Sequence, residues 1–218
     1  MSLLAHYLGG SEVIMSKKVE AQKIDSNVIE QIAADVEHAM SLNRQGHPLK
    51  ARKFLLRAKG AAARAEIQSA TLEWACAACS DYLNDASAAM SYSASALRLD
   101  PLSPSFRRSR QIIVERLRRT VLDAPPRAVF IPEYAVLLIA AGLEDAEVLF
   151  ALAAHYAAVG RARDALEVLD KLADKREEAE VLKLRAELHD RLGEHDLARA
   201  SRERIVDMAE VNMPSAEA

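Results

Sequence analysis

The pair Cys76 and Cys79 is the arrangement in this sequence that could most directly do chemistry. A CxxC spacing serves disulfide exchange in thioredoxin-like proteins and supplies half of the ligands of many zinc sites. Here the pair lies in an alanine-rich stretch without a βαβ pattern, and neither a second cysteine pair nor an HxxxH sequence accompanies it. We therefore interpret both residues as small buried thiols at a contact between helices.

A second chemical feature is the segment 104–122, which holds six arginines and one glutamate. A helix here would place Phe106, Ile113, Leu117 and Val121 on one face, with most of the arginines opposite. The sequence therefore predicts a charged surface, which consists of Arg107, Arg108, Arg116, Arg118 and Arg119. A solvated helix face is the alternative interpretation of the same residues.

The charges are distributed unevenly along the chain. Residues 50–119 hold 13 Lys and Arg against 6 Asp and Glu, whereas residues 120–218 hold 12 against 20. Such polarity could steer an acidic partner to the middle of the chain or favour head-to-tail contact between copies.

The histidines and carboxylates do not form a catalytic motif. His155, His189 and His195 belong to no HExxH, no GxSxG, no phosphate-binding glycine loop and no dinucleotide fingerprint. Neighbouring carboxylates such as Glu177 and Glu178 fit exposed helix surfaces beside Lys and Arg. We expect no catalytic activity, no cofactor and no metal site.

The elements that must position these residues are predicted from a five-residue offset between a turn residue and an alanine. Glycine or asparagine can adopt the left-handed conformation that ends a helix, and an alanine one turn into the next helix lets two backbones approach closely. Each offset predicts a helical hairpin, which buries its apolar face by stacking on its neighbours. The four pairs are Gly46 with Ala51, Asn84 with Ala89, Gly160 with Ala165, and Gly193 with Ala198.

The composition agrees with an all-α protein. The 218 residues are 50% hydrophobic but 5% aromatic, which favours closely packed helices over sheets. The longest apolar run, 134–143, is about half of the roughly 20 residues that a membrane helix requires. The first ten residues lack the basic start and long apolar core of a secretory signal, so we expect a soluble, cytoplasmic protein. We interpret residues 1–14 as an upstream extension, because Met15 begins a sequence typical of a protein start.

The sequence predicts one helical repeat domain at 26–210, between a flexible N-terminal arm at 1–25 and a disordered tail at 211–218. Prolines interrupt the third of its helix pairs, where the short apolar run 127–131 is interpreted as a connector rather than a strand. The predicted pairs lie near 26–69, 70–101, 104–142, 144–174 and 177–210.

The period of about 34 residues, with two helices per unit, is typical of tetratricopeptide repeats. The matching residues of 146–172 are Leu149, Leu152, Ala153, Tyr156, Gly160, Ala165, Leu169 and Leu172, and those of the next unit are Leu182, Ala186, Gly193, Ala198 and Ile205. Residues 96–101 carry the usual closing phrase of a repeat. The chain therefore resembles the tetratricopeptide repeat family. The resemblance implies an all-α, right-handed superhelical solenoid of about five antiparallel helix pairs.

The resemblance also implies a partner-binding groove lined by the first helix of each pair. At its key positions this chain has Val36, Met40, Trp74, Ala78, Phe150 and Ala154, followed in the last pair by Lys183 and Glu187. The best-known peptide clamp of the family uses Lys, Arg and Asn at such positions, so that clamp is missing here. An apolar groove for a partner helix or peptide is expected instead. Trp74 would be its anchor, with packing in the core as the alternative.

We therefore expect a protein–protein interaction adaptor or scaffold. One alternative is a bacterial secretion-type chaperone that holds a co-encoded partner. The other is a nucleic-acid-linked regulator that uses the Arg-rich helix. Nucleic acid is the weaker prediction, because the pI is about 6.1 and no aromatic residues lie between the arginines to stack on bases. The sequence is compatible with a homo-oligomer.

Overall fold

The computed structural model describes residues 26–143, 145–173 and 178–211, and these residues form ten helices and no strand. The predicted all-α fold is confirmed. The described residues belong to two compact units, of which the first ends at Val114 and the second begins at Glu115. No helix in the described part of the chain is both long enough and apolar enough to cross a membrane. The predicted arm at 1–25 and residues 212–218 of the predicted tail lie outside the described residues.

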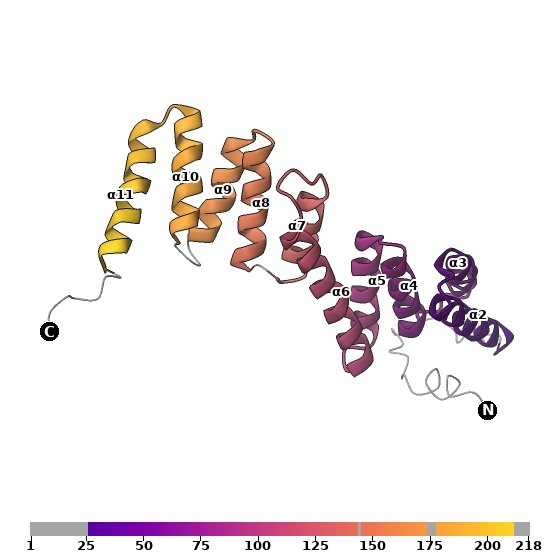
Figure 1. Ribbon diagram of the computed structural model, residues 1–218. Helices are drawn as coiled ribbons and strands as arrows, with labels where there is room; N and C mark the ends of the chain where they lie inside the picture. Colours follow the sequence, from indigo (N-terminus) through magenta and orange to yellow (C-terminus); the bar gives the residue numbers. More distant parts are fainter. Residues whose placement is uncertain (1–25, 144, 174–177, 212–218) are drawn as a thin grey trace. The chain divides into compact units, whose positions relative to one another are not determined.

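The first unit consists of two stacked hairpins and the beginning of a further helix (Figure 1). Helix α2 packs against α3, helix α4 packs against α5, and α4 also contacts α2 and α3. Ile32, Val36, Leu55 and Leu72 are buried in the core between the hairpins. The helices are α2 (Ser26–Arg44), α3 (Pro48–Arg64), α4 (Ala70–Tyr82), α5 (Ala86–Leu99) and α6 (Pro104–Leu122).

The second unit repeats this arrangement. Helices α8 and α9 form one hairpin and α10 and α11 another, and α10 packs on both helices of the preceding hairpin. Helix α7 packs on α8. The helices that follow α6 are α7 (Ile131–Ala140), α8 (Ala146–Ala158), α9 (Ala162–Ala173), α10 (Ala179–Leu192) and α11 (His195–Val211). Stacked antiparallel hairpins are thus observed, whereas their winding into a right-handed superhelix stays a prediction.

The turns inside the four hairpins are built as the sequence predicts. Their turn residues all have a left-handed backbone, with φ of 76° at Gly46, 56° at Asn84, 82° at Gly160 and 77° at Gly193. The next residue joins both helices: the N–H of Arg161 donates to the Tyr156 carbonyl at 2.8 Å, and its carbonyl accepts from the Ala165 N–H at 3.1 Å. The alanines that follow these turns are completely buried, namely Ala51, Ala89, Ala165 and Ala198.

Helix α3 ends at Arg64, about five residues earlier than the sequence predicts. The residue that reverses the chain is Glu66, whose φ is 55°. The N–H of Ile67 then donates to the Ala62 carbonyl at 2.9 Å. A search for glycine or asparagine misses this turn, because left-handed glutamate is uncommon.

Residues 123–130 connect α6 and α7 through turns and contain no strand. The N–H of Ala128 donates to the Pro125 carbonyl at 2.9 Å, and that of Ile131 to the Ala128 carbonyl at 3.2 Å. The interpretation of 127–131 as a connector is confirmed up to Phe130, because Ile131 already begins α7.

Gly160→Ala should lower the free energy of unfolding by about 1 kcal/mol, because alanine is strained at a φ of 82°. No atom lies within 4 Å of the added Cβ, so the destabilisation comes from backbone strain and not from a steric clash. The matched control is Gly60→Ala inside α3, where the added Cβ makes an ordinary 3.6 Å contact with Arg64; it should stabilise by roughly 0.5–1 kcal/mol. Urea unfolding measures the free energy of unfolding of both variants. Equal changes in the two variants would contradict a left-handed turn at Gly160.

Ala165→Leu should overpack the contact between α8 and α9 and destabilise by roughly 1–3 kcal/mol, because Ala165 is 0% exposed. Ala200→Leu, at an exposed position of α11, serves as the control for added apolar volume. Thermal unfolding compares the two, and an unchanged midpoint for Ala165→Leu would refute the assigned close contact.

Candidate functional site

The second unit contains an apolar pocket of about 560 Å³ beside α8. Phe150, Ala151 and Ala154 of α8 contribute to its lining, and Phe150 is half-buried. Five further segments complete the wall: the end of α6, the connector, the start of α7, the end of α9 and the start of α10. Their apolar residues are Val121, Leu122, Ala124, Pro126, Ile131, Leu172 and Val181.

Two polar side chains, His155 and Arg118, hold together the segments around this pocket. The buried His155 donates from Nδ1 to the carbonyl of Pro126 at 2.8 Å, which ties the connector to α8. The Arg118 guanidinium donates to the Asp145 carboxylate at 2.6 Å and also to Glu147, which ties α6 to the start of α8. Asp145 in turn caps α8 by accepting the Val148 N–H at 2.7 Å. The pocket therefore has walls held by specific contacts.

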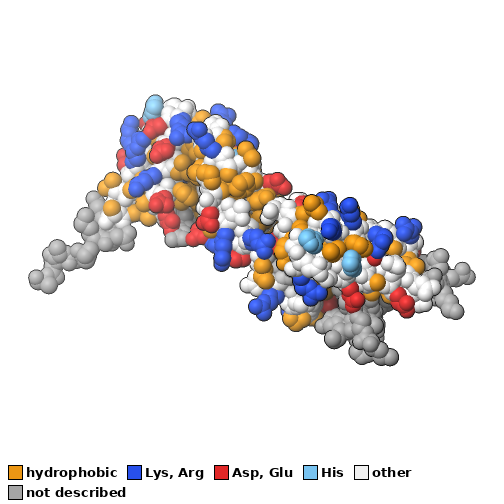
Figure 2. Space-filling model, turned by 45° about the vertical axis from the view of Figure 1, so that its right-hand side comes forward, with side chains coloured by type: hydrophobic (Ala, Val, Ile, Leu, Met, Phe, Trp, Pro, Cys, Tyr) orange, Lys and Arg blue, Asp and Glu red, His pale blue; other side chains and the backbone are white. Residues whose placement is uncertain are grey.

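The charged residues of the described pocket lining are three glutamates. Glu147 and Glu180 are exposed, and Glu178 is half-buried at the N-cap of α10. Residues 174–177, which precede Glu178, lie outside the described residues. In the view of Figure 2, charged side chains surround exposed hydrophobic ones on both units. The pocket thus combines an apolar lining with a negative rim.

The predicted groove residues fall into two groups. Phe150 and Ala154 line the pocket of the second unit. In the first unit, Val36 is 4% exposed and belongs to the core, and Met40 packs against that core. The half-buried Trp74 packs on Phe106 with ring centroids 5.8 Å apart, and Ala78 is half-buried. A groove that uses all six residues stays a prediction.

The arginines of α6 differ in what they contact. The apolar face is as predicted, with Phe106, Ile113, Leu117 and Val121 all buried. Arg107 donates twice to the carbonyl of Pro101, and Arg119 pairs with Glu115 at 2.9 Å. Both side chains are exposed, as are Arg108 and Arg116. Arg118 is 24% exposed and pairs with Asp145 at the start of α8. It therefore links α6 to the start of α8 as well as adding to the surface charge.

The remaining arginine of this helix, Arg110, contacts α5. It donates to the Met90 carbonyl at 3.1 Å and to Ser93 Oγ at 3.0 Å. Burial lowers the pKa of its guanidinium, because the charged form is desolvated there. Arg110 is therefore a packing residue rather than a docking residue.

Both cysteines are free and buried, as the sequence predicts. Desolvation raises the pKa of the Cys76 thiol to about 12 and also raises the pKa of Cys79. Cys79 Sγ lies 3.4 Å from the Pro48 carbonyl of α3. Because the thiolate is the reactive form, these residues are chemically quiet packing groups.

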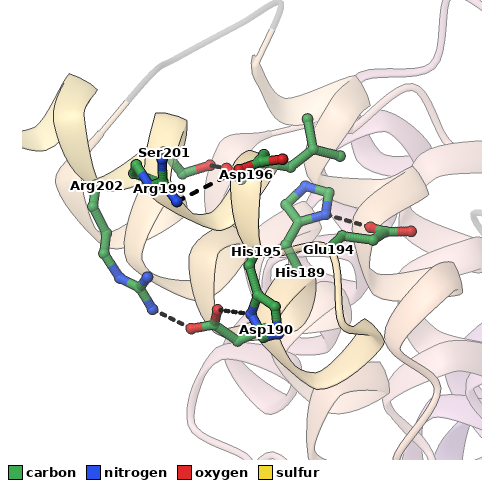
Figure 3. A network of polar contacts seen from close by, with 9 residues as sticks. His189, Asp190, Glu194, His195, Asp196, Arg199, Ser201 and Arg202 are labelled. Carbon is green, nitrogen blue, oxygen red and sulfur yellow. Dashed lines mark hydrogen bonds and ion pairs between the residues drawn. The ribbon is translucent and has the colours of Figure 1, made fainter.

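The C-terminal hairpin carries a network of polar side chains around its turn (Figure 3). His189 Nδ1 lies 2.7 Å from Glu194, and His195 Nδ1 lies 3.3 Å from Asp190. Arg202 of α11 also pairs with Asp190, and both partners hold the pKa of that carboxyl below its ordinary value, with Arg202 as the larger cause. Within the described residues, no group of His, Cys, Asp and Glu could hold a metal ion. We interpret the network as a link between α10 and α11.

No family model and no curated protein match the chain. Among solved structures, it is similar to MamA from residue 41 to its end, from Desulfovibrio magneticus RS-1, with 17% identity and a TM-score of 0.36. That match covers 85% of this chain and 98% of the other. A MamA RS-1 ArsTM double mutant gives the same identity and TM-score, over 86% and 98% of the two chains. Similarity at this level carries no argument about function, and the tetratricopeptide resemblance stays a prediction.

The sequence indicated two of the pocket residues, Phe150 and Ala154, and missed the rest. The glutamates and Pro126 lie at separate places along the chain, as does His155, which holds Pro126 in place, and no motif links them. The proline-rich interruption of the third pair was the one available indication that this region departs from a regular hairpin.

The native thiols should react slowly with iodoacetamide at pH 8. A pKa near 12 leaves about one thiolate in ten thousand for Cys76 at that pH, against about one in ten at its ordinary value of 9.0. Mass spectrometry should find alkylation accelerated at least about a hundredfold in urea. Equal rates in the folded and unfolded protein would contradict the burial of the pair.

Proposed function

We propose that this protein is an interaction scaffold that binds a segment of another protein in the pocket beside α8. The observation that carries the proposal is the apolar pocket of about 560 Å³, which lies within the roughly 300–1,000 Å³ of typical ligand pockets. The half-buried ring of Phe150 offers the contact area that aromatic hot spots supply. Burial of an apolar side chain of the partner would provide most of the affinity.

The chemistry of the lining supports binding rather than catalysis. The ionisable side chains of the described lining are all carboxylates. The described lining contains no Ser, Cys or His, so it offers no nucleophile paired with a base. We propose on these grounds that the pocket does not catalyse a reaction. Glu147 and Glu180 are exposed, so they would meet the parts of a partner that extend beyond the pocket.

The pocket is compatible with one of the two alternative functions, the chaperone, and disfavours the other, the nucleic-acid-linked regulator. A chaperone that holds an apolar segment of a partner would use it in the same way, and the two proposals differ in whether the partner folds without this protein. A nucleic-acid partner is disfavoured at this site, because the glutamates would repel phosphates.

Ala154→Trp tests the proposal, because an indole at this position would fill the pocket without removing any described contact of the wall. Peptides of 12 residues are selected from a randomised display library against the full chain, and the tightest binders are synthesised. We expect their Kd to rise at least about tenfold on Ala154→Trp, as for the loss of a buried anchor. Isothermal titration calorimetry provides the measurement.

The matched control is Ala200→Trp, which adds the same side chain at an exposed position of α11. Its peptide affinity should equal that of the natural sequence, and thermal unfolding should show both variants folded. Failure to select any peptide, or equal binding by Ala154→Trp, would refute the proposed pocket.

A further inference from the structure

We propose that the partner segment carries Lys or Arg beside the apolar side chain that enters the pocket. This inference rests on the proposed function and adds the chemistry of the partner. It follows from the two kinds of residue that line the pocket. Most of the lining is apolar, and the charged residues in it are glutamates.

The acidic edge comes from two helix starts that face the same cavity. Glu147 lies in the first turn of α8, and Glu178 and Glu180 lie at the start of α10. Arg118 lies at this edge, where it pairs with both Asp145 and Glu147. Two carboxylates against one guanidinium leave this side of the pocket negative.

The charge of the surrounding chain has the same sign. The second unit, Glu115–Ala218, holds 15 Lys and Arg against 21 Asp and Glu in its sequence. A cationic segment would thus be attracted on approach as well as at the rim, which raises the association rate. An acidic segment with the same apolar side chain would meet repulsion at both stages.

The exposed Glu180 on the rim suits a polypeptide partner. Glu180 is exposed at the start of α10, whereas the 57% exposed Glu147 also pairs with Arg118. A group that fills the apolar interior leaves the exposed Glu180 carboxylate to contact whatever emerges from the pocket. In a polypeptide those emerging groups are the residues that flank the anchor, and Lys or Arg would pair with the rim.

Glu180→Lys reverses one rim charge on the exposed side of α10. Its matched control is Glu203→Lys on α11, an exposed glutamate that does not line the pocket, so both variants change the net charge equally. The probes are the tightest selected peptide and its variant in which every Lys or Arg is replaced by Gln. Calorimetry measures the affinity of the natural protein and of both variants for each peptide at low and at high NaCl, and thermal unfolding verifies that both variants are folded.

We expect the selected peptides to carry Lys or Arg next to an apolar residue. Glu180→Lys should weaken binding roughly three- to tenfold at low salt, and Glu203→Lys by less than about twofold. Both the Gln peptide and high salt should reduce the difference between the two variants. These results together would support a cationic apolar partner.

Other outcomes would overturn the inference. Peptides that Ala154→Trp rejects but Glu180→Lys binds normally would retain the pocket and refute the cationic partner. Peptides without Lys or Arg would do the same. Concentration-dependent dimers in sedimentation velocity that Ala154→Trp abolishes would assign the pocket to a second copy of this chain. If Ala154→Trp changes no binding, the proposed function itself fails.

Discussion

The left-handed residue at each hairpin turn is the constraint on which the rest of the structure depends. It reverses the chain so sharply that one following residue closes the first helix with its N–H and opens the second with its carbonyl, as Arg161 does. The second helix then begins against the first, and a completely buried alanine such as Ala165 fits at the point of closest approach. Hairpins of this kind expose apolar faces on both sides, so their stacking follows from the hydrophobic effect.

The pocket arises where this regular construction is interrupted. Between α6 and α7 the chain follows a connector at 123–130 instead of a tight turn, and Ala124 and Pro126 of that connector enter the pocket wall. A connector without helical hydrogen bonds needs other partners, which the buried His155 supplies for Pro126. The interruption therefore produces a concave apolar surface without leaving its wall unsupported.

Charge is divided between structure and surface in a way that composition does not reveal. Arg110 and Arg118 are engaged by neighbouring helices, because a partly buried guanidinium must find acceptors. Asp190 similarly links α10 to α11 through Arg202. At the pocket rim, Glu147 is likewise engaged by Arg118, whereas Glu180 is exposed.

The sequence by itself determined the helices and the turns, because both depend on local properties. Gly46, Asn84, Gly160 and Gly193 permit a backbone that most residues avoid, and the apolar period along α6 sets its buried face. The left-handed Glu66 shows the limit of this reasoning, since nothing in its residue type requires that conformation. Only the tertiary structure decided which residues form the pocket. Its lining comes from six segments between Val121 and Val181, and packing between helices rather than any local pattern brings them together.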